Sequence, residues 1–194
     1  MMLSDSEILE AIANGEIDIQ PFNKDALGPC SVDLTLDSVF LVYHPGEPID
    51  VRLQDPSRNN TELVDTGGEP FVIRPHQFIL GQTRETVAVS PRLAALLEGR
   101  SSIARFGIIV HAAGLVNPGT GAMRPGKLTL EIFCENESPV ILYPGMRIVQ
   151  IMFVRLGRTA TITYDKRPES KYVGQQLPSI RPISGWPDQN RDEE

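Results

Sequence analysis

Turn-forming residues punctuate the whole chain, and their spacing limits the folds that it can adopt. Gly and Pro contribute 16 residues each to a chain of 194. Short apolar runs lie between them, at 71–73, 78–80, 108–110, 140–142 and 148–154. Many short strands joined by turns are typical of an all-β barrel or sandwich. The sequence therefore predicts a mainly β fold with a few short helices, and this length suits a single domain over residues 1–194.

One strand is predicted by strict alternation. Val32, Leu34 and Leu36 fall on one face, with polar residues between them. Because successive side chains of a strand point to opposite faces, we expect these three side chains in the core.

Two short helices are expected. Residues 4–7 read S-x-x-E, a capping box that satisfies free backbone N–H groups at a helix start. An apolar stripe of Ile8, Leu9, Ile12 and Ala13 follows, and Gly15 is a suitable stop.

The second helix is expected over 91–98. Ser90 can cap it, Pro91 suits the first helical position, and Gly99 can end it.

Charge and cysteine content exclude several classes of protein. The 18 basic and 25 acidic residues give a net charge of −7, which disfavours binding to nucleic acid. A polyanionic ligand would need a local cationic cluster or a metal ion. Cys30 and Cys134 are too far apart for a Cys-x-x-Cys motif, and two cysteines make no disulfide framework. We see neither a signal peptide nor an apolar run long enough to span a membrane, so a cytoplasmic protein is expected.

The first candidate for chemistry is the segment 99–107, Gly-Arg-Ser-Ser-Ile-Ala-Arg-Phe-Gly. Its two arginines and two hydroxyls can donate charge-assisted hydrogen bonds to phosphate oxygens. The alternative is a solvated turn in which Arg100 pairs with Glu98.

The second candidate is Glu131 in the strand 127–133. Leu128, Leu130 and Ile132 share one face, which leaves Glu131 on the other beside Thr129. A carboxylate among apolar neighbours can have the raised pKa that a general acid/base needs. On pattern alone, an outward-facing structural Glu is the more frequent case.

The third candidate is the segment 164–176, where cations, phenols and amides gather near the C-terminus. Such a segment can close over an anionic ligand, or it can be a hydrophilic loop. The tail after it, over about 177–194, is expected to be partly flexible.

The order of these segments and their amino-acid sequences resemble those of a known family. LEGRSSIARFG, VHAAGLVNPG, KLTLEIF, YPGMRIVQIMF and SKYVGQQ follow an opening of MLSDSEI, DIQPF and PCSVDLTL. Together they resemble the dCTP deaminases of the dUTPase-like superfamily, from about Met2 to Gln176.

The resemblance implies a distorted dUTPase-like β-barrel that assembles as a homotrimer, with active sites at subunit interfaces. It implies deamination of dCTP to dUTP and ammonia, with dTTP as a possible inhibitor, and with Mg²⁺ held by the triphosphate rather than by the protein. In the family, the Glu of the T-L-E strand is the catalytic acid/base, which is Glu131 here. The remaining nucleotide contacts carry over to Arg100, Ser101, Ser102, Arg105, Ala113, Asn117, Thr129, Tyr164, Lys171 and Gln175.

The deamination is expected to proceed without a metal at the base. Zinc deaminases need an H-x-E motif followed by P-C-x-x-C. Here His111 precedes two alanines and no Cys-x-x-Cys exists, so no zinc is expected. Glu131 would take a proton from water and later protonate the departing ammonia. Arg105 and Ser101 are the candidates for orienting Glu131 and that water.

The chain departs from the family around residue 117. Relatives have Asp where this chain has Asn117, and the bifunctional enzymes use that Asp to activate water against the phosphate chain. An amide cannot act as that base. This chain is also one residue shorter before Asn117 and has extra residues around 120–125. We therefore expect dUTP as the product. A bifunctional enzyme that forms dUMP, a plain dUTPase and a non-catalytic nucleotide-binding homologue are the alternatives.

Overall fold

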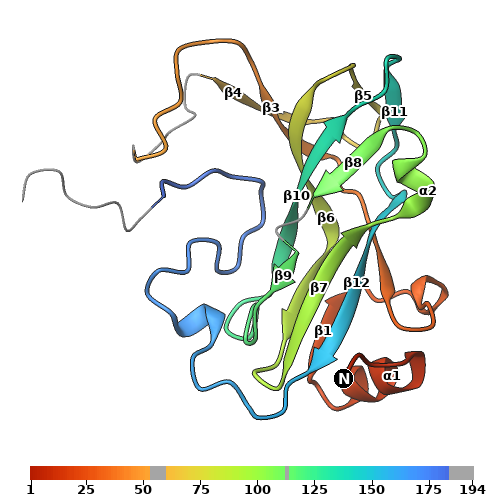
Figure 1. The fold of residues 1–194 in the computed structure, drawn as a ribbon, viewed down its shortest axis with the longest axis vertical. Helices are drawn as coiled ribbons and strands as arrows, with labels where there is room; N and C mark the ends of the chain where they lie inside the picture. Colours follow the sequence, from red (N-terminus) through yellow and green to blue (C-terminus); the bar gives the residue numbers. More distant parts are fainter. Residues whose placement is uncertain (53–59, 112–113, 184–194) are drawn as a thin grey trace, which may run out of the picture.

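Strands dominate the computed structural model, which describes residues 1–52, 60–111 and 114–183 (Figure 1). The elements follow in the order α1 (Asp5–Ala13), β1 (Ile17–Gln20), the 3₁₀ helix η1 (Lys24–Ala26), β2 (Val32–Thr35), β3 (Val39–Tyr43), β4 (Thr61–Asp65), β5 (Phe71–Ile73), β6 (Phe78–Val89), β7 (Leu93–Gly99), α2 (Ser101–Ala104), β8 (Ile108–His111), β9 (Leu115–Val116), β10 (Gly126–Cys134), β11 (Val140–Leu142), β12 (Arg147–Arg155) and the 3₁₀ helix η2 (Tyr164–Lys166). The mainly β class is confirmed, and all five apolar runs lie in strands.

The strands pair antiparallel in three sheets. The largest has the order β4-β3-β6-β10-β8, with β1 also paired to β6. A second has the order β2-β12-β7-β9, and β11 pairs with β5. Within the described ranges these ladders do not close into one barrel. The β10 strand lies between β6 and β8, so its side chains are held from both edges.

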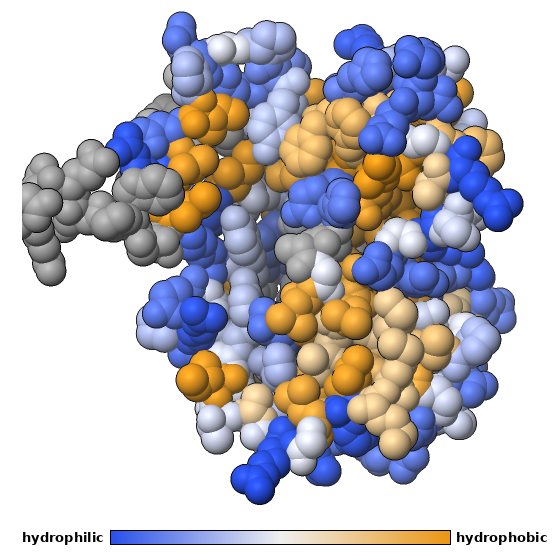
Figure 2. Space-filling view, viewed as in Figure 1, coloured by the Kyte–Doolittle hydropathy of each residue, from blue (hydrophilic) through white to orange (hydrophobic). Residues whose placement is uncertain are grey.

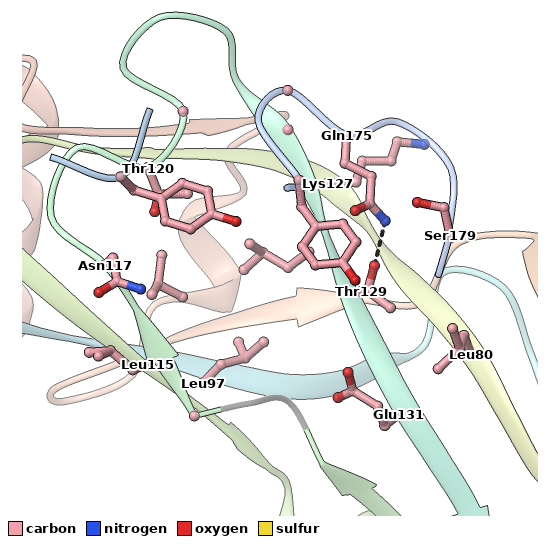
Figure 3. A pocket seen from close by; sticks show the side chains of 18 of the residues that line it. Leu80, Leu97, Leu115, Asn117, Thr120, Lys127, Thr129, Glu131, Gln175 and Ser179 are labelled. Carbon is pink, nitrogen blue, oxygen red and sulfur yellow. Dashed lines mark hydrogen bonds between the residues drawn. The ribbon is translucent and has the colours of Figure 1, made fainter. Parts of the chain in front are cut away.

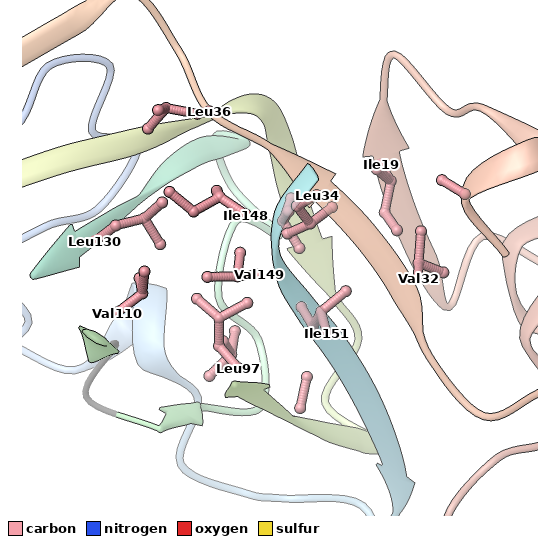
Figure 4. Packing of buried hydrophobic residues seen from close by; sticks show 14 of the residues in the cluster. Ile19, Val32, Leu34, Leu36, Leu97, Val110, Leu130, Ile148, Val149 and Ile151 are labelled. Atoms are coloured by element: carbon pink, nitrogen blue, oxygen red, sulfur yellow. The ribbon is translucent and has the colours of Figure 1, made fainter. Parts of the chain in front are cut away.

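The core lies between the sheets, where apolar side chains of β2, β7, β10 and β12 meet (Figure 4). The predicted alternation is confirmed, because Val32, Leu34 and Leu36 are all fully buried. Leu130 and Ile132 of β10 are also fully buried. Burial of several such side chains, each worth about 1.5–3 kcal/mol, fixes the register of the strand that carries Glu131.

The first predicted helix is confirmed as α1. Glu7 accepts hydrogen bonds from the backbone N–H and the hydroxyl of Ser4, at 2.8 and 2.9 Å. Gly15 adopts a φ of +69°, a conformation that favours glycine just after a helix. The buried stripe is Ile8, Ala11 and partly Ile12, whereas Leu9 and Ala13 are exposed. No helix in the described part of the chain is long and apolar enough to cross a membrane.

The second predicted helix is wrong, because residues 93–99 form the strand β7. Its burial alternates, and it pairs along its whole length with β12. The capping signals form a turn instead, in which Leu93 N–H donates to the carbonyl of Ser90 over 3.1 Å. Local capping is worth about 1 kcal/mol, so a long ladder with a buried face overrides it.

Candidate active site

A cavity of about 420 Å³ lies between β10 and the C-terminal segment, and we name it the β10 cavity (Figure 3). Three parts of the chain supply most of its polar lining. They are β10, the turn 117–120 with the glycine that follows it, and the segment 164–180. The polar side chains include Asn117, Thr120, Lys127, Thr129, Glu131, Tyr164, Asp165, Tyr172, Gln175 and Ser179.

Glu131 projects into this cavity from β10. It pairs with Leu80 of β6 on one side and with His111 of β8 on the other. Its neighbours along the strand, Leu130 and Ile132, point to the core, so the pleat turns Glu131 the other way. The side chain is half-buried, and its Oε2 atom is buried without a hydrogen-bond partner among the described residues.

Burial raises the pKa of Glu131 above its ordinary 4.5, while a backbone hydrogen bond and the nearby His111 oppose this shift. A buried carboxylate oxygen without a partner is costly unless a ligand or water satisfies it. The geometry therefore presents a carboxyl group that can exchange a proton with a molecule bound in the cavity.

The C-terminal segment docks directly on β10. The backbone N–H of Lys127 donates to the carbonyl of Gln175 over 2.8 Å. Nε2 of Gln175 donates to Oγ1 of Thr129 over 2.6 Å, as the dashed line in Figure 3 marks. Gly126 allows these two backbones to approach closely, because a Cβ at this position would lie 3.0 Å from the backbone nitrogen of Gln175. The segment 171–176 thus forms one wall of the β10 cavity.

The turn 117–120 forms the opposite wall. The N–H of Thr120 donates to the carbonyl of Asn117 over 3.1 Å, and the N–H of Tyr164 donates to the carbonyl of Pro118 over 2.9 Å. Burial raises the pKa of Tyr164, so its phenol stays protonated and can donate a hydrogen bond.

The segment 99–107 opens onto a different cavity, of about 630 Å³, which we name the α2 cavity. Arg100, Ser101 and Ser102 line it, together with Asp33 and His111. The predicted partner of Arg100 in the solvated-turn alternative is wrong, because Arg100 Nε pairs with Asp33 over 3.2 Å instead of with Glu98. Asp33 lies in β2, beside the paired β12, and no local pattern indicates that contact.

The predicted site residues therefore divide into two groups. Asn117, Thr129, Glu131, Tyr164 and Gln175 share the β10 cavity. Arg100, Ser101 and Ser102 line the α2 cavity, and the exposed Arg105 lines neither. The ammonium of Lys171 donates to the carbonyl of Pro182. Ala113 and most of the predicted flexible tail lie outside the described residues. The roles of all these residues stay predictions.

Two charged cavity residues, Lys127 and Asp165, were not singled out from the sequence. Lys127 lines the cavity and pairs with Asp37 over 2.5 Å, and this contact joins residues 90 positions apart. Asp165 also lines the cavity, where it accepts backbone hydrogen bonds from the 120–125 segment. Its place beside Tyr164 in the third candidate segment was the available signal. Within the described ranges, no group of three His, Cys, Asp or Glu residues could hold a metal ion.

Comparisons with known proteins agree with this arrangement. The sequence model of the "dCTP deaminase-like" family matches residues 2–156. A protein of Dictyoglomus thermophilum named "dCTP deaminase, dUMP-forming" is 41% identical over 184 residues, and the match covers 92% of this chain and 93% of that protein. A protein of the same name from Mycobacterium sp. (strain KMS) is 37% identical over 185 residues, and that match covers 92% of this chain and 94% of the mycobacterial protein.

One solved structure supports the fold. The crystal structure of 2′-deoxycytidine 5′-triphosphate deaminase from Agrobacterium tumefaciens matches with a TM-score of 0.61 and 22% identity. The match covers 80% of this chain and 48% of that one, so this chain spans about half its length. The family model matches most of the chain, and both relatives are more than one-third identical to it. The chain therefore belongs to the dCTP deaminase-like family.

Proposed function

We propose that this protein is a hydrolase that removes the 4-amino group of dCTP at Glu131 and carries the nucleotide on to dUMP. One observation carries the first part. Oε2 of Glu131 is buried in the β10 cavity without a hydrogen-bond partner among the described residues, and burial raises the pKa of this carboxyl group. The names of the relatives support dCTP as the substrate.

The deamination follows from acid–base chemistry at this one group. Glu131 takes a proton from water, and the hydroxide adds to C4 of the cytosine ring. The C4–N bond then breaks as Glu131 returns the proton to the leaving amino group, which departs as ammonia. General acid–base catalysis of this kind contributes about 10²–10⁴-fold in rate. Thr129 and Gln175 line the same cavity as Glu131, and their polar side chains would hold the nucleotide there.

The product is the point on which the relatives change our expectation. Asn117 alone favours dUTP, because an amide cannot take the proton of an attacking water. The relatives are named for dUMP formation, and this supports the bifunctional alternative. We therefore propose dUMP and diphosphate as the final products.

We also propose that the active site is completed in a homotrimer. The predicted contacts of the α2 cavity and those of the β10 cavity lie apart in one chain, so a neighbouring subunit would have to bring them together. Apolar side chains also gather over the strands on the face drawn in Figure 2. Leu96 and Leu115 pair across β7 and β9, and both are exposed. Subunit contacts cover exposed apolar surface of this kind.

A magnesium ion would be bound through the oxygens of the triphosphate. It would neutralise charge on the phosphate chain, which a protein of net charge −7 otherwise repels. dTTP remains a candidate inhibitor, since it shares the sugar and the triphosphate.

Incubation of the protein with dCTP and Mg²⁺, with ammonia, dUTP and dUMP measured separately over time, tests the function. Ammonia and dUMP in equal amounts are expected. Release of ammonia with dUTP as the only nucleotide product would show a deaminase that stops at dUTP, and would contradict the proposed formation of dUMP. Binding of dCTP without ammonia release would identify a non-catalytic nucleotide-binding homologue and would contradict the proposal.

A further inference from the structure

The β10 cavity holds a second carboxylate, that of Asp165 in η2. Among the described lining residues, only Glu131 and Asp165 are acidic. Formation of dUMP needs a base for the water that attacks phosphorus, and the amide of Asn117 cannot serve. Glu131 is already used at C4 of the ring. Asp165 is therefore the carboxylate of this cavity that the deamination leaves free.

Contacts place Asp165 next to the turn that carries Asn117. Tyr164, the residue before it, donates its N–H to the carbonyl of Pro118 over 2.9 Å. The same turn is closed by the bond from Thr120 to Asn117. Figure 3 shows Asn117 and Thr120 on one side of the cavity and Glu131 well away from them. The two carboxylates thus serve different parts of one cavity.

The carboxylate of Asp165 is held in a fixed orientation. Oδ1 accepts from the N–H of Gly121 over 3.1 Å, and Oδ2 accepts from the N–H of Met123 over 2.8 Å. Both donors belong to the extra residues around 120–125. Each carboxylate oxygen has two lone pairs, so one backbone bond to each leaves two positions for water. The segment that departs from the family therefore orients a carboxylate that can still take a proton.

We propose that Asp165 is the general base for release of diphosphate, in place of the residue at position 117. The inference rests on the proposed function, in which dUTP is carried on to dUMP. Asp165 takes a proton from water, whose oxygen bonds to the α-phosphorus. The bond from the α-phosphorus to the bridging oxygen of the β-phosphate breaks, and diphosphate leaves with that electron pair. Asp165 then returns its proton to solvent.

The test compares ammonia release with dUMP formation for Asp165→Asn. The variant should release ammonia at a rate within about threefold of the parent rate. It should form dUMP at least about 100-fold more slowly than the parent, so that dUTP accumulates. The matched control is Glu169→Gln, an exposed carboxylate of the same segment paired with Arg167. It should keep the parent ratio of dUMP to ammonia. Addition of Asn117→Asp to the Asp165→Asn variant, with return of dUMP, would support the proposal further.

Two results would overturn the assignment of Asp165. The first is dUMP formation by Asp165→Asn at the rate of the parent. The second is an equal fall in ammonia and dUMP, which would show that Asp165 only supports the cavity wall. A parent that releases ammonia and stops at dUTP would instead refute the proposed product, and with it the need for this base.

Discussion

The side-chain amide of Gln175 donates to the hydroxyl of Thr129 over 2.6 Å, and so ties the C-terminal segment to the strand of Glu131. Thr129 lies two residues before Glu131 and on the same face of β10. If the segment 171–176 closes the cavity over the nucleotide, loss of this bond should weaken binding more than chemistry. Gln175→Ala should therefore raise KM for dCTP about tenfold, with kcat within about threefold of the parent.

Steady-state kinetics of two Thr129 variants test the same bond from the other side. Thr129→Ser keeps the hydroxyl and should behave like the parent. Thr129→Val removes it and should reproduce the effect of Gln175→Ala. A fall in kcat at unchanged KM in either Gln175→Ala or Thr129→Val would contradict a binding role.

Replacement of Glu131 by Gln should stop deamination without loss of nucleotide binding. Gln is close in shape but cannot move a proton, so ammonia release should fall by about 10²–10⁴-fold. Calorimetric titration with dCTP should still show binding. Glu135→Gln is the matched control, because Glu135 follows the same strand and is exposed. Ammonia release by Glu131→Gln within a few-fold of the parent would refute the role of Glu131.

The raised pKa of Glu131 also predicts how stability depends on pH. A carboxyl group with a higher pKa in the folded chain than its ordinary 4.5 binds its proton more tightly when folded. Its contribution to stability is full below that ordinary value and is lost as pH rises through the raised pKa. Once the pH is above the raised pKa, the ionised, half-buried carboxylate therefore costs stability, and Gln has no such cost.

Thermal unfolding of the parent and of Glu131→Gln, measured from about pH 4 to about pH 8, tests this reasoning. The variant should be the more stable protein near neutrality, and the difference in Tm should shrink toward pH 4. A difference that stays constant over the whole range would show that Glu131 titrates alike in the folded and unfolded chain.

The sequence predicted the class of the fold because alternation and turn residues act locally. Val32, Leu34 and Leu36 are buried as their spacing requires, and α1 begins at its capping box. The strand β7 was missed because its partner β12 lies about 55 positions further along the chain. The single domain over 1–194 and the cytoplasmic location stay predictions.

The candidate site was predictable to the extent that its residues lie on one strand. Alternation alone turns Glu131 away from Leu130 and Ile132, and the structure confirms this. The other residues of the site are positioned by contacts between turns, and no periodicity of the sequence predicts such contacts. Asp165 lines the cavity while two backbone N–H groups of the 120–125 segment hold its carboxylate, and these contacts join residues more than 40 positions apart.

Arg105 lies outside the β10 cavity that holds Glu131, and this separation makes a prediction about assembly. If Glu131 of one subunit works with Arg105 of its neighbour, a variant of either residue should be inactive by itself. Glu131→Gln and Arg105→Ala subunits, unfolded and refolded together, would form mixed trimers. In a random equal mixture, about one quarter of the sites would have both residues intact, and about one quarter of the parent activity should return.

Light scattering on the refolded mixture checks for the mass of a trimer. A trimeric mixture without recovered activity would mean that each chain builds its own site, and a monomer mass would exclude the shared site altogether.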